Sequence, residues 1–196
     1  LSYYVISNKS DIFKLPEVKP EPTHEQKYSK YFDFVLDHYP QVTQWHGDTA
    51  YRKDHSGIDF GVKQQQVFAP ADGIVRYSQW NEYDGECYQG GNTIRIEHPN
   101  GMYSVFFHLE NYTNNSGNDT KVGDIVKKGD LIGTSGNTGY YNCKPLGYHL
   151  HFELRKSKDR VTHVNPVPYV DVDWTQIKTV PNNKNALTGD NPHPNY

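Results

Sequence analysis

The 196-residue sequence has few cysteines, no excess of positive charge and no long apolar run. Two cysteines cannot build the multi-disulfide framework of a small secreted domain, and no Cys-x-x-Cys spacing is present. The formal net charge of -3 leaves no basic surface of the kind that binds nucleic acid. No apolar run approaches the roughly 20 residues that cross a membrane as a helix. We therefore expect no nucleic-acid partner and no membrane span in this chain.

Histidine, in contrast, is plentiful, and four of the ten histidines fall with one aspartate into three short motifs. The motifs are His55-Ser-Gly-Ile-Asp59, Phe107-His108-Leu109 and His149-Leu150-His151. A hydrolytic zinc site needs three protein ligands, an open position for water, and neighbouring groups that move protons or stabilise an oxyanion. These four histidines and one aspartate can supply all of those groups.

The spacing within the motifs matters because side chains alternate along a strand. In an extended segment over residues 148–154, His149 and His151 share one face and the leucines and phenylalanine fill the other. His55 and Asp59 can likewise face one point if their segment is extended. A single histidine is more often an ordinary buried or surface residue, but spaced sets inside apolar strand patterns favour a metal site.

From residue 42 onward the pattern is all β, and the 35% hydrophobic content permits one domain with a modest core. Short runs rich in Val, Ile, Tyr and Phe are separated by Asp-Gly, Gly-Gly, Asn-Gly and Lys-Gly turns. The clearest predicted strands cover residues 67–75, 92–97, 103–108, 125–132 and 149–154.

The sequence patterns at the two ends of the chain differ from the β pattern between them, so we divide the chain into residues 1–41, 42–170 and 171–196. Residues 23–39 have helix-like charge spacing, begin with a capping-box pair, Thr23 and Gln26, and end before Pro40. We expect a helix packed on the back of the sheet; the alternative is an inhibitory or substrate-positioning extension over the groove. Residues 171–196, rich in proline and asparagine, are expected to be extended or poorly ordered.

Further motifs accompany the histidine motifs in order along residues 42–170. They are Val67-Phe-Ala-Pro-Ala-Asp-Gly-Ile-Val75, Asn92-Thr-Ile-Arg-Ile-Glu-His98, Asn100-Gly-Met-Tyr-Ser-Val-Phe-Phe-His108, Val122-Gly-Asp-Ile-Val-Lys-Lys-Gly-Asp-Leu-Ile-Gly133, Gly136-Asn-Thr-Gly139, His149-Leu-His-Phe-Glu-Leu154 and Val164-Asn-Pro-Val167. This collinear set resembles the catalytic domain of the LytM/lysostaphin-type zinc metallopeptidases, the M23 family of cell-wall endopeptidases. The resemblance covers roughly two thirds of the chain and implies a mainly β, antiparallel sandwich-like catalytic domain with a short, partly helical N-terminal extension.

The resemblance implies that His55, Asp59 and His151 bind one zinc ion per chain, with His149 and His108 as the catalytic histidines beside it. There is no His-Glu-x-x-His motif, so no glutamate next to a ligand offers itself as general base. His149 is the expected base, because it lies two residues from His151 and imidazole titrates in the useful range. His108 is expected to orient the water or stabilise the oxyanion, and the division of these roles stays open.

The implied activity is that of a zinc metalloendopeptidase, a peptidoglycan hydrolase that cleaves peptide cross-links by attack of a zinc-activated water. The substrate is either the glycine-rich bridge or the D-alanine-linked stem peptide. Such an enzyme works as an extracellular or cell-envelope protein, and we expect a monomer. Because the chain begins with Leu1 and shows no leader, we expect a processed form from which a signal or anchor has been removed.

Two other classes of function are open to this sequence. A peptidoglycan-binding or hydrolase-activating module without activity shares the fold, but such relatives usually lack some ligands, and no position of the core pattern is missing here. Residues 122–132 also resemble the closing half of a lipoyl or biotinyl carrier domain. The carrier reading is disfavoured because no lysine is displayed on a tight hairpin between matching strands.

Several further residues are weaker candidates. Glu153 shares the alternation of His149 and His151, so we consider it as a partner that holds a histidine tautomer or as an ordinary carboxylate. Tyr51 is considered as an oxyanion donor, among sixteen tyrosines. Aromatic residues near the motifs are considered as walls of a peptide groove or as strand packing: Tyr77, Trp80, Tyr140 and Tyr141.

The only two cysteines, Cys87 and Cys143, fall in stretches that look like insertions relative to the family pattern. A metal role is not expected, because the zinc already has its ligands. A cell-wall enzyme works in an oxidising compartment, where a disulfide persists. We therefore predict a Cys87–Cys143 disulfide at the rim of the groove, with two free thiols as the alternative.

Overall fold

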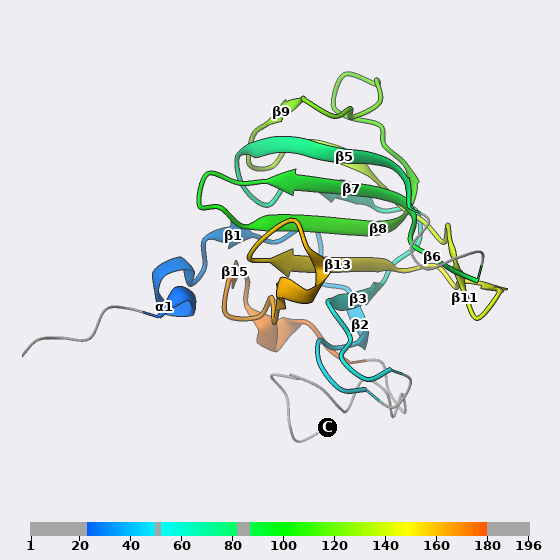
Figure 1. Ribbon diagram of the computed structural model, residues 1–196, viewed down its shortest axis with the longest axis horizontal. Helices are drawn as coiled ribbons and strands as arrows, with labels where there is room; N and C mark the ends of the chain where they lie inside the picture. The colour runs from blue at the N-terminus through cyan, green and yellow to red at the C-terminus, as the bar shows by residue number, and fades with distance from the viewer. Residues whose placement is uncertain (1–22, 50–51, 82–86, 180–196) are drawn as a thin grey trace, which may run out of the picture.

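The computed structural model describes residues 23–49, 52–81 and 87–179, which form a mainly β domain (Figure 1). Its one α-helix among these residues, α1, spans His24–Tyr28, and two 3-10 turns, η1 and η2, span Arg160–Thr162 and Trp174–Gln176. The strands are β1 (Phe32–Asp33), β2 (Gln41–Gln44), β3 (Ile58–Gly61), β4 (Gln66–Phe68), β5 (Gly73–Asn81), β6 (Tyr88–Gln89), β7 (Gly91–Glu97), β8 (Tyr103–Asn111), β9 (Ile125–Val126), β10 (Leu131–Ser135), β11 (Tyr140–Tyr141), β12 (Lys144–Pro145), β13 (Leu150–Arg155), β14 (His163–Val164) and β15 (Val170–Asp171).

The central sheet has the strand order β2-β3-β13-β8-β7-β5-β9, and each neighbouring pair is antiparallel. β10 extends the layer by pairing with β4 and β8, and β14 pairs with β13. A small three-stranded sheet, β12-β11-β6, stands at one end of the long strands, and β1 and β15 form a two-stranded sheet (Figure 1). The predicted mainly β, antiparallel fold is confirmed.

The core lies on one face of the central sheet, where alternate residues of neighbouring strands meet. Ile94, Phe106 and Phe152 are almost completely buried, and the rings of Phe106 and Phe152 lie 5.4 Å apart. β13 is unusual because all six of its residues are buried. Its apolar residues enter the core, which leaves His151 and Glu153 on the opposite face, where the candidate site lies.

Two of the predicted strands are each interrupted by a turn. Residues 69–72 separate β4 from β5, and residues 127–130 separate β9 from β10. In the second turn the Asp130 carboxylate accepts from the Lys127 N–H at 2.8 Å, and Gly129 has φ +84°. The predictions of continuous strands at 67–75 and 125–132 are therefore wrong, because these turn residues break the ladder.

The predicted helix over residues 23–39 is wrong beyond Tyr28. Lys30 has φ 53°, which ends the helical path, and β1 then pairs in parallel with β15. The reason is burial: Phe32 and Val35 are completely inaccessible and join the core. Tertiary packing of these apolar residues outweighs a helix propensity that is worth only a fraction of a kcal/mol per residue.

The C-terminal segment also contributes to the folded domain, as far as residue 179. Ile177 is completely buried, Trp174 packs against the core, and Val42 forms a parallel bridge with Thr179. The expectation of an extended or poorly ordered tail is thus wrong for residues 171–179, and residues 180–196 lie outside the described part. Across the three described ranges, no helix is both long and apolar enough to cross a membrane.

Candidate metal centre

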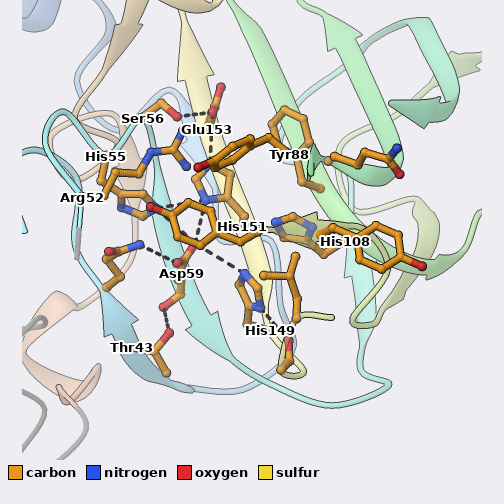
Figure 2. Close-up of a pocket in the computed structure, with 18 of the residues that line it drawn as sticks. Thr43, Arg52, His55, Ser56, Asp59, Tyr88, His108, His149, His151 and Glu153 are labelled. Atoms are coloured by element: carbon orange, nitrogen blue, oxygen red, sulfur yellow. Dashed lines mark hydrogen bonds and ion pairs between the residues drawn. The ribbon is translucent and has the colours of Figure 1, made fainter. Parts of the chain in front are cut away.

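Three ligand atoms converge where β3 meets β13 (Figure 2). Asp59 and His151 are directly opposite each other in the antiparallel register, and the Asp59 Oδ1 to His151 Nδ1 distance is 2.6 Å. His55 Nε2 lies 3.1 Å from His151 Nδ1 and 3.3 Å from Asp59 Oδ1. Within the described residues this is the one group of three side chains placed so that they could hold a metal ion, and all three are buried. The cross-strand register and the loop before β3 thus bring together the three residues that the resemblance implied as zinc ligands.

Each ligand is oriented by a second contact on its far side. His55 Nδ1–H donates to the Trp45 carbonyl at 2.7 Å, and His151 Nε2–H donates to Glu153 Oε1 at 3.0 Å. Gln44 Nε2 donates to Asp59 Oδ2 at 3.0 Å. Because these contacts occupy the outer atoms, His55 Nε2, His151 Nδ1 and Asp59 Oδ1 all face a single point.

Glu153 is held in a buried polar network behind His151. Its carboxylate accepts from Ser56 Oγ at 2.5 Å and from Arg155 Nε at 2.5 Å, and the residue is 1% exposed. Burial alone raises its pKa, but the hydrogen bond and charge of His151 and the charge of Arg155 outweigh this and lower the pKa of Glu153 to about 2. Glu153 is therefore an anion that can hold one tautomer of His151.

The charges within the site stabilise one another. Burial opposes ionisation of Asp59, but the three neighbouring histidines, His55, His149 and His151, hold the pKa of this carboxyl well below its usual range. Burial likewise lowers the pKa of His151, yet the Asp59 charge and hydrogen bond prevail and raise it to about 9. A metal ion at this point would take the place of the proton that Asp59 and His151 share.

Two further histidines border this centre. His149 precedes β13, and its Nε2 lies 4.0 Å from Asp59 Oδ1 while its Nδ1–H donates to the Gly147 carbonyl at 2.8 Å. His108 Nδ1–H donates to the Thr138 carbonyl at 2.9 Å, and its ring centroid is 4.6 Å from that of His149. A carbonyl only accepts, so both histidines carry a proton on Nδ1, and Nε2 is the proton acceptor of each ring in its neutral form.

The direction of His108 depends on a β-bulge. The β7–β8 register shifts between Asn92 and Ile94, and His108 itself has φ 65°. Strict alternation would place His108 on the opposite face from Phe107, but the bulge puts both beside His151, with ring centroids 6.1 Å and 5.4 Å from it. Leu109 then returns to the core. Burial lowers the pKa of His108 well below its usual value, aided by the charges of His149 and His151, which keeps its imidazole neutral.

The five residues lie on the floor of an open groove of about 560 Å³. One wall comes from the small sheet and the segment before His149, with Tyr88, Tyr140, Tyr141 and Tyr148 among its residues. Arg52 and Arg160 also line the groove. None of the described residues of the N-terminal segment, 23–41, lines the groove.

Only some of the aromatic residues considered as groove walls line the groove. Tyr140 and Tyr141 line the groove, whereas Tyr77 and Trp80 do not. Tyr88 and Tyr148 were missed, although each adjoins a residue singled out in the sequence, Cys87 and His149. Tyr51 lies outside the described residues.

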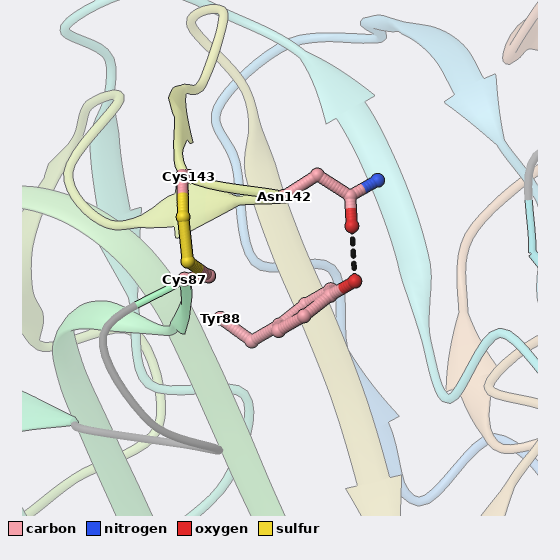
Figure 3. Close-up of a disulfide and its surroundings, with 4 residues drawn as sticks. All are labelled: Cys87, Tyr88, Asn142 and Cys143. Carbon is pink, nitrogen blue, oxygen red and sulfur yellow. Dashed lines mark hydrogen bonds between the residues drawn. A yellow bond between two sulfur atoms is a disulfide. The ribbon is translucent and has the colours of Figure 1, made fainter.

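Cys87 and Cys143 are joined by a disulfide in the structure (Figure 3). The Cys143 N–H donates to the Cys87 carbonyl at 3.1 Å, and the Tyr88 hydroxyl donates to the Asn142 side chain. The bond ties the start of β6 to the turn between β11 and β12. It therefore fastens together the two segments that carry Tyr88, Tyr140 and Tyr141 of this wall.

Two imidazoles and one carboxylate, with further imidazoles beside them and open space in front, form the donor set of a hydrolytic metal centre. The wider comparison then identifies the family. Residues 53–166 match the model of peptidase family M23, and the chain belongs to that family.

Two curated relatives illustrate the family's range. The glycyl-glycine endopeptidase ALE-1 of Staphylococcus capitis is 34% identical over 120 residues, which cover 60% of this chain and 29% of ALE-1. The peptidoglycan DD-endopeptidase ShyC of Vibrio cholerae is 32% identical over 110 residues, covering 56% of this chain and 22% of ShyC. The chain thus matches less than a third of the length of either relative.

Two solved structures share the fold. The catalytic domain of the antimicrobial peptidase lysostaphin from Staphylococcus simulans superposes with a TM-score of 0.55 at 29% identity, covering 66% of this chain and 91% of that domain. A zinc-containing peptidase from Vibrio cholerae superposes with a TM-score of 0.52 at 26% identity, covering 70% and 39%. The fold thus agrees with the family assignment. Members of this family are peptidases, and peptidases are hydrolases.

Proposed function

We propose that this protein is a zinc-dependent endopeptidase that hydrolyses peptide cross-links of bacterial peptidoglycan. The observation that carries the proposal is the convergence of His55, Asp59 and His151, whose ligand atoms lie within 4.8 Å of one another at the floor of an open groove. Residues 42–170 supply all five central side chains, so we propose this range as the catalytic unit. The complete set disfavours the alternative of a non-catalytic binding or activating module.

Zinc fits this donor set. Two imidazole nitrogens and one carboxylate oxygen are typical ligands of a catalytic zinc ion, whereas magnesium and calcium favour oxygen alone. Held by these three residues, a zinc ion would lower the pKa of a water and polarise the scissile carbonyl. The related Vibrio cholerae structure is described as a zinc-containing peptidase, which supports the choice of metal.

The protein's own residues then handle the proton. His149 accepts a proton from the attacking water at Nε2, because its Nδ1–H is already committed to Gly147. It can return that proton to the amine leaving group. His108 presents a neutral Nε2 acceptor next to His149, so we assign it the task of orienting the water. Its buried position keeps it from competing for the proton.

The substrate assignment rests on the groove and on the relatives. An open groove with tyrosines along one wall suits an extended peptide. ALE-1 is a glycyl-glycine endopeptidase and ShyC is a peptidoglycan DD-endopeptidase, so both bridge types remain within the proposal. A substrate of this kind places the protein outside the cytoplasm, in the cell envelope or the extracellular space, and we propose that it acts there as a monomer.

Digestion of purified peptidoglycan tests the proposal. Glycine-bridged and directly D-alanine-linked peptidoglycan are incubated with zinc-loaded protein, and the products are identified by mass spectrometry. We expect cleavage of a peptide bond in at least one substrate, and cleavage slower by about 10²-fold or more with the His149→Ala variant. Binding of zinc and of both substrates without any cleavage would instead identify the non-catalytic module.

A further inference from the structure

A second pair of histidines, His46 and His163, lies outside the groove. His46 Nε2 is 2.9 Å from His163 Nδ1, and the rings meet edge to face with centroids 5.0 Å apart and an interplanar angle of 64°. His163 Nε2 lies 3.3 Å from the Asp54 carboxylate. His46 and His163 are both partly buried and are 117 positions apart in the sequence.

Local backbone pairing explains why Asp54 is available to this pair. Gly47 and His55 exchange two backbone hydrogen bonds, of 2.9 Å and 2.8 Å, which close the intervening loop. His46 and Asp54 flank this bridge at the two ends of the loop. His163 is the first residue of β14, whose pairing with β13 brings it to the same place.

The pair has the same arrangement as the two histidines of the proposed zinc centre. There, His55 Nε2 and His151 Nδ1 are 3.1 Å apart, with centroids at 4.8 Å and an angle of 72°. In each pair an Nε2 faces an Nδ1, and in each the other nitrogen of the second histidine meets a carboxylate, Glu153 or Asp54. A carboxylate is one of the common partners behind a histidine that binds a metal in a protein.

We propose that His46 and His163 form a second divalent metal site, with His46 Nε2 and His163 Nδ1 as ligands and Asp54 orienting His163. Imidazole pairs suit zinc, copper and nickel. Only His55, Asp59 and His151 form a three-donor group in the described residues, so water completes the coordination here and the second site binds zinc more weakly than the first.

The site joins two segments that are distant in sequence. A metal ion that binds the folded protein and not the unfolded chain stabilises the fold in proportion to the logarithm of its concentration. His46 also follows Trp45, whose carbonyl accepts from His55 Nδ1. The second ion therefore fixes the segment that orients a ligand of the first.

Zinc titration of the holoprotein tests this inference. Untagged protein that already holds one equivalent of zinc is titrated with Zn²⁺ and followed by isothermal calorimetry and thermal unfolding. We expect a second, weaker equivalent and a rise in Tm with zinc concentration. His163→Gln and His46→Gln should each abolish the second event while the first equivalent and its activity persist.

The control variant is His38→Gln, which removes an exposed histidine that also contacts an aspartate, Asp37. It should leave both binding events unchanged. A single binding event in the wild-type protein overturns the proposal, as does a second event that survives His163→Gln. Loss of the second event in His108→Ala, but not in His163→Gln, would place the extra ion in the groove. Failure of hydrolysis alone bears on the proposed function and not on this site.

Discussion

Glu153 lies directly behind His151, with its Oε1 3.0 Å from Nε2 while Nδ1 of the same ring faces Asp59. The two residues share one face of β13, and both are buried. The carboxylate therefore decides which nitrogen of His151 carries the proton and which is left for a metal.

Replacement of Glu153 by Gln should lower zinc affinity about 10- to 100-fold, the usual cost of losing a carboxylate behind a ligand histidine. The change also leaves the buried Arg155 guanidinium without its 2.5 Å carboxylate partner. Zinc affinity is measured by competition with a chelator. Glu97→Gln, which removes a carboxylate paired with Arg76 at the surface, is the control. Equal zinc affinity in the two folded variants would show that Glu153 does not position His151.

The two groove histidines separate catalysis from metal binding. Because His149 and His108 are proposed to sit beside the ion, His149→Ala and His108→Ala should keep most of the zinc and the fold while hydrolysis falls by about 10²-fold or more. Metal content and turnover are measured on the same samples. Unchanged turnover in both variants contradicts the assignment, and loss of zinc from His149→Ala would exchange its role with that of His151.

The disulfide is expected to stabilise the groove wall. Thiol titration of the unreduced, denatured protein should find no free thiol, since Cys87 and Cys143 are paired. The two cysteines are 56 positions apart in the sequence. Closing a loop of this length stabilises the folded protein by up to about 4 kcal/mol in the chain-entropy model. The Cys87→Ser/Cys143→Ser protein should therefore unfold at lower denaturant and hydrolyse peptide more slowly. Two free thiols per chain in the native preparation would refute the pairing.

His98 gives the fold a specific acid sensitivity. Burial lowers the pKa of this histidine from 6.5 to about 4, while its nitrogens contact the Asp72 carbonyl and Ser104 Oγ, both at 2.8 Å. In the unfolded chain His98 is protonated as the pH falls through 6.5, whereas in the folded protein it is protonated only near pH 4. Stability is therefore lost as the pH falls through this window, by about 3 kcal/mol.

Denaturant unfolding of the wild type and of His98→Gln at several pH values measures the contribution of His98 to the pH dependence of stability. The variant should lose less stability than the wild type between about pH 6.5 and about pH 4, the window set by the two pKa values. His38→Gln, at an exposed histidine, should follow the wild type. Parallel curves for His98→Gln and the wild type would show that His98 does not titrate differently on folding.

Much of the fold could be predicted from strand periodicity, whereas the proposed ligand group was implied by the resemblance of its motifs to a known family. Asp59 and His151 are neighbours across the antiparallel ladder of β3 and β13, along which apolar and polar residues alternate in the sequence. The direction of His108 could not be predicted, because it depends on a bulge that breaks alternation. The buried contact of Ser56 with Glu153 joins a loop to a strand 97 positions away, which no local pattern reveals.

The wrong predictions for the two ends of the chain have one physical cause, which is packing between residues that are far apart in the sequence. Local patterns predicted a long helix after Thr23 and an extended or poorly ordered end after residue 170, but Phe32 and Ile177 are completely buried in the same core. The pair of His46 and His163 was not anticipated for the same reason, since only the folded chain brings them together.

The central claim is that His55, Asp59 and His151 bind the ion that hydrolysis requires. Its most direct test is the metal content of wild-type, His55→Ala and Asp59→Ala proteins, purified without added zinc and assayed for peptidoglycan cleavage on the same samples. The account predicts one tightly held equivalent of zinc and cleavage in the wild type, and loss of both in each variant, with circular dichroism confirming the fold. A full equivalent of zinc in folded His55→Ala protein would contradict it.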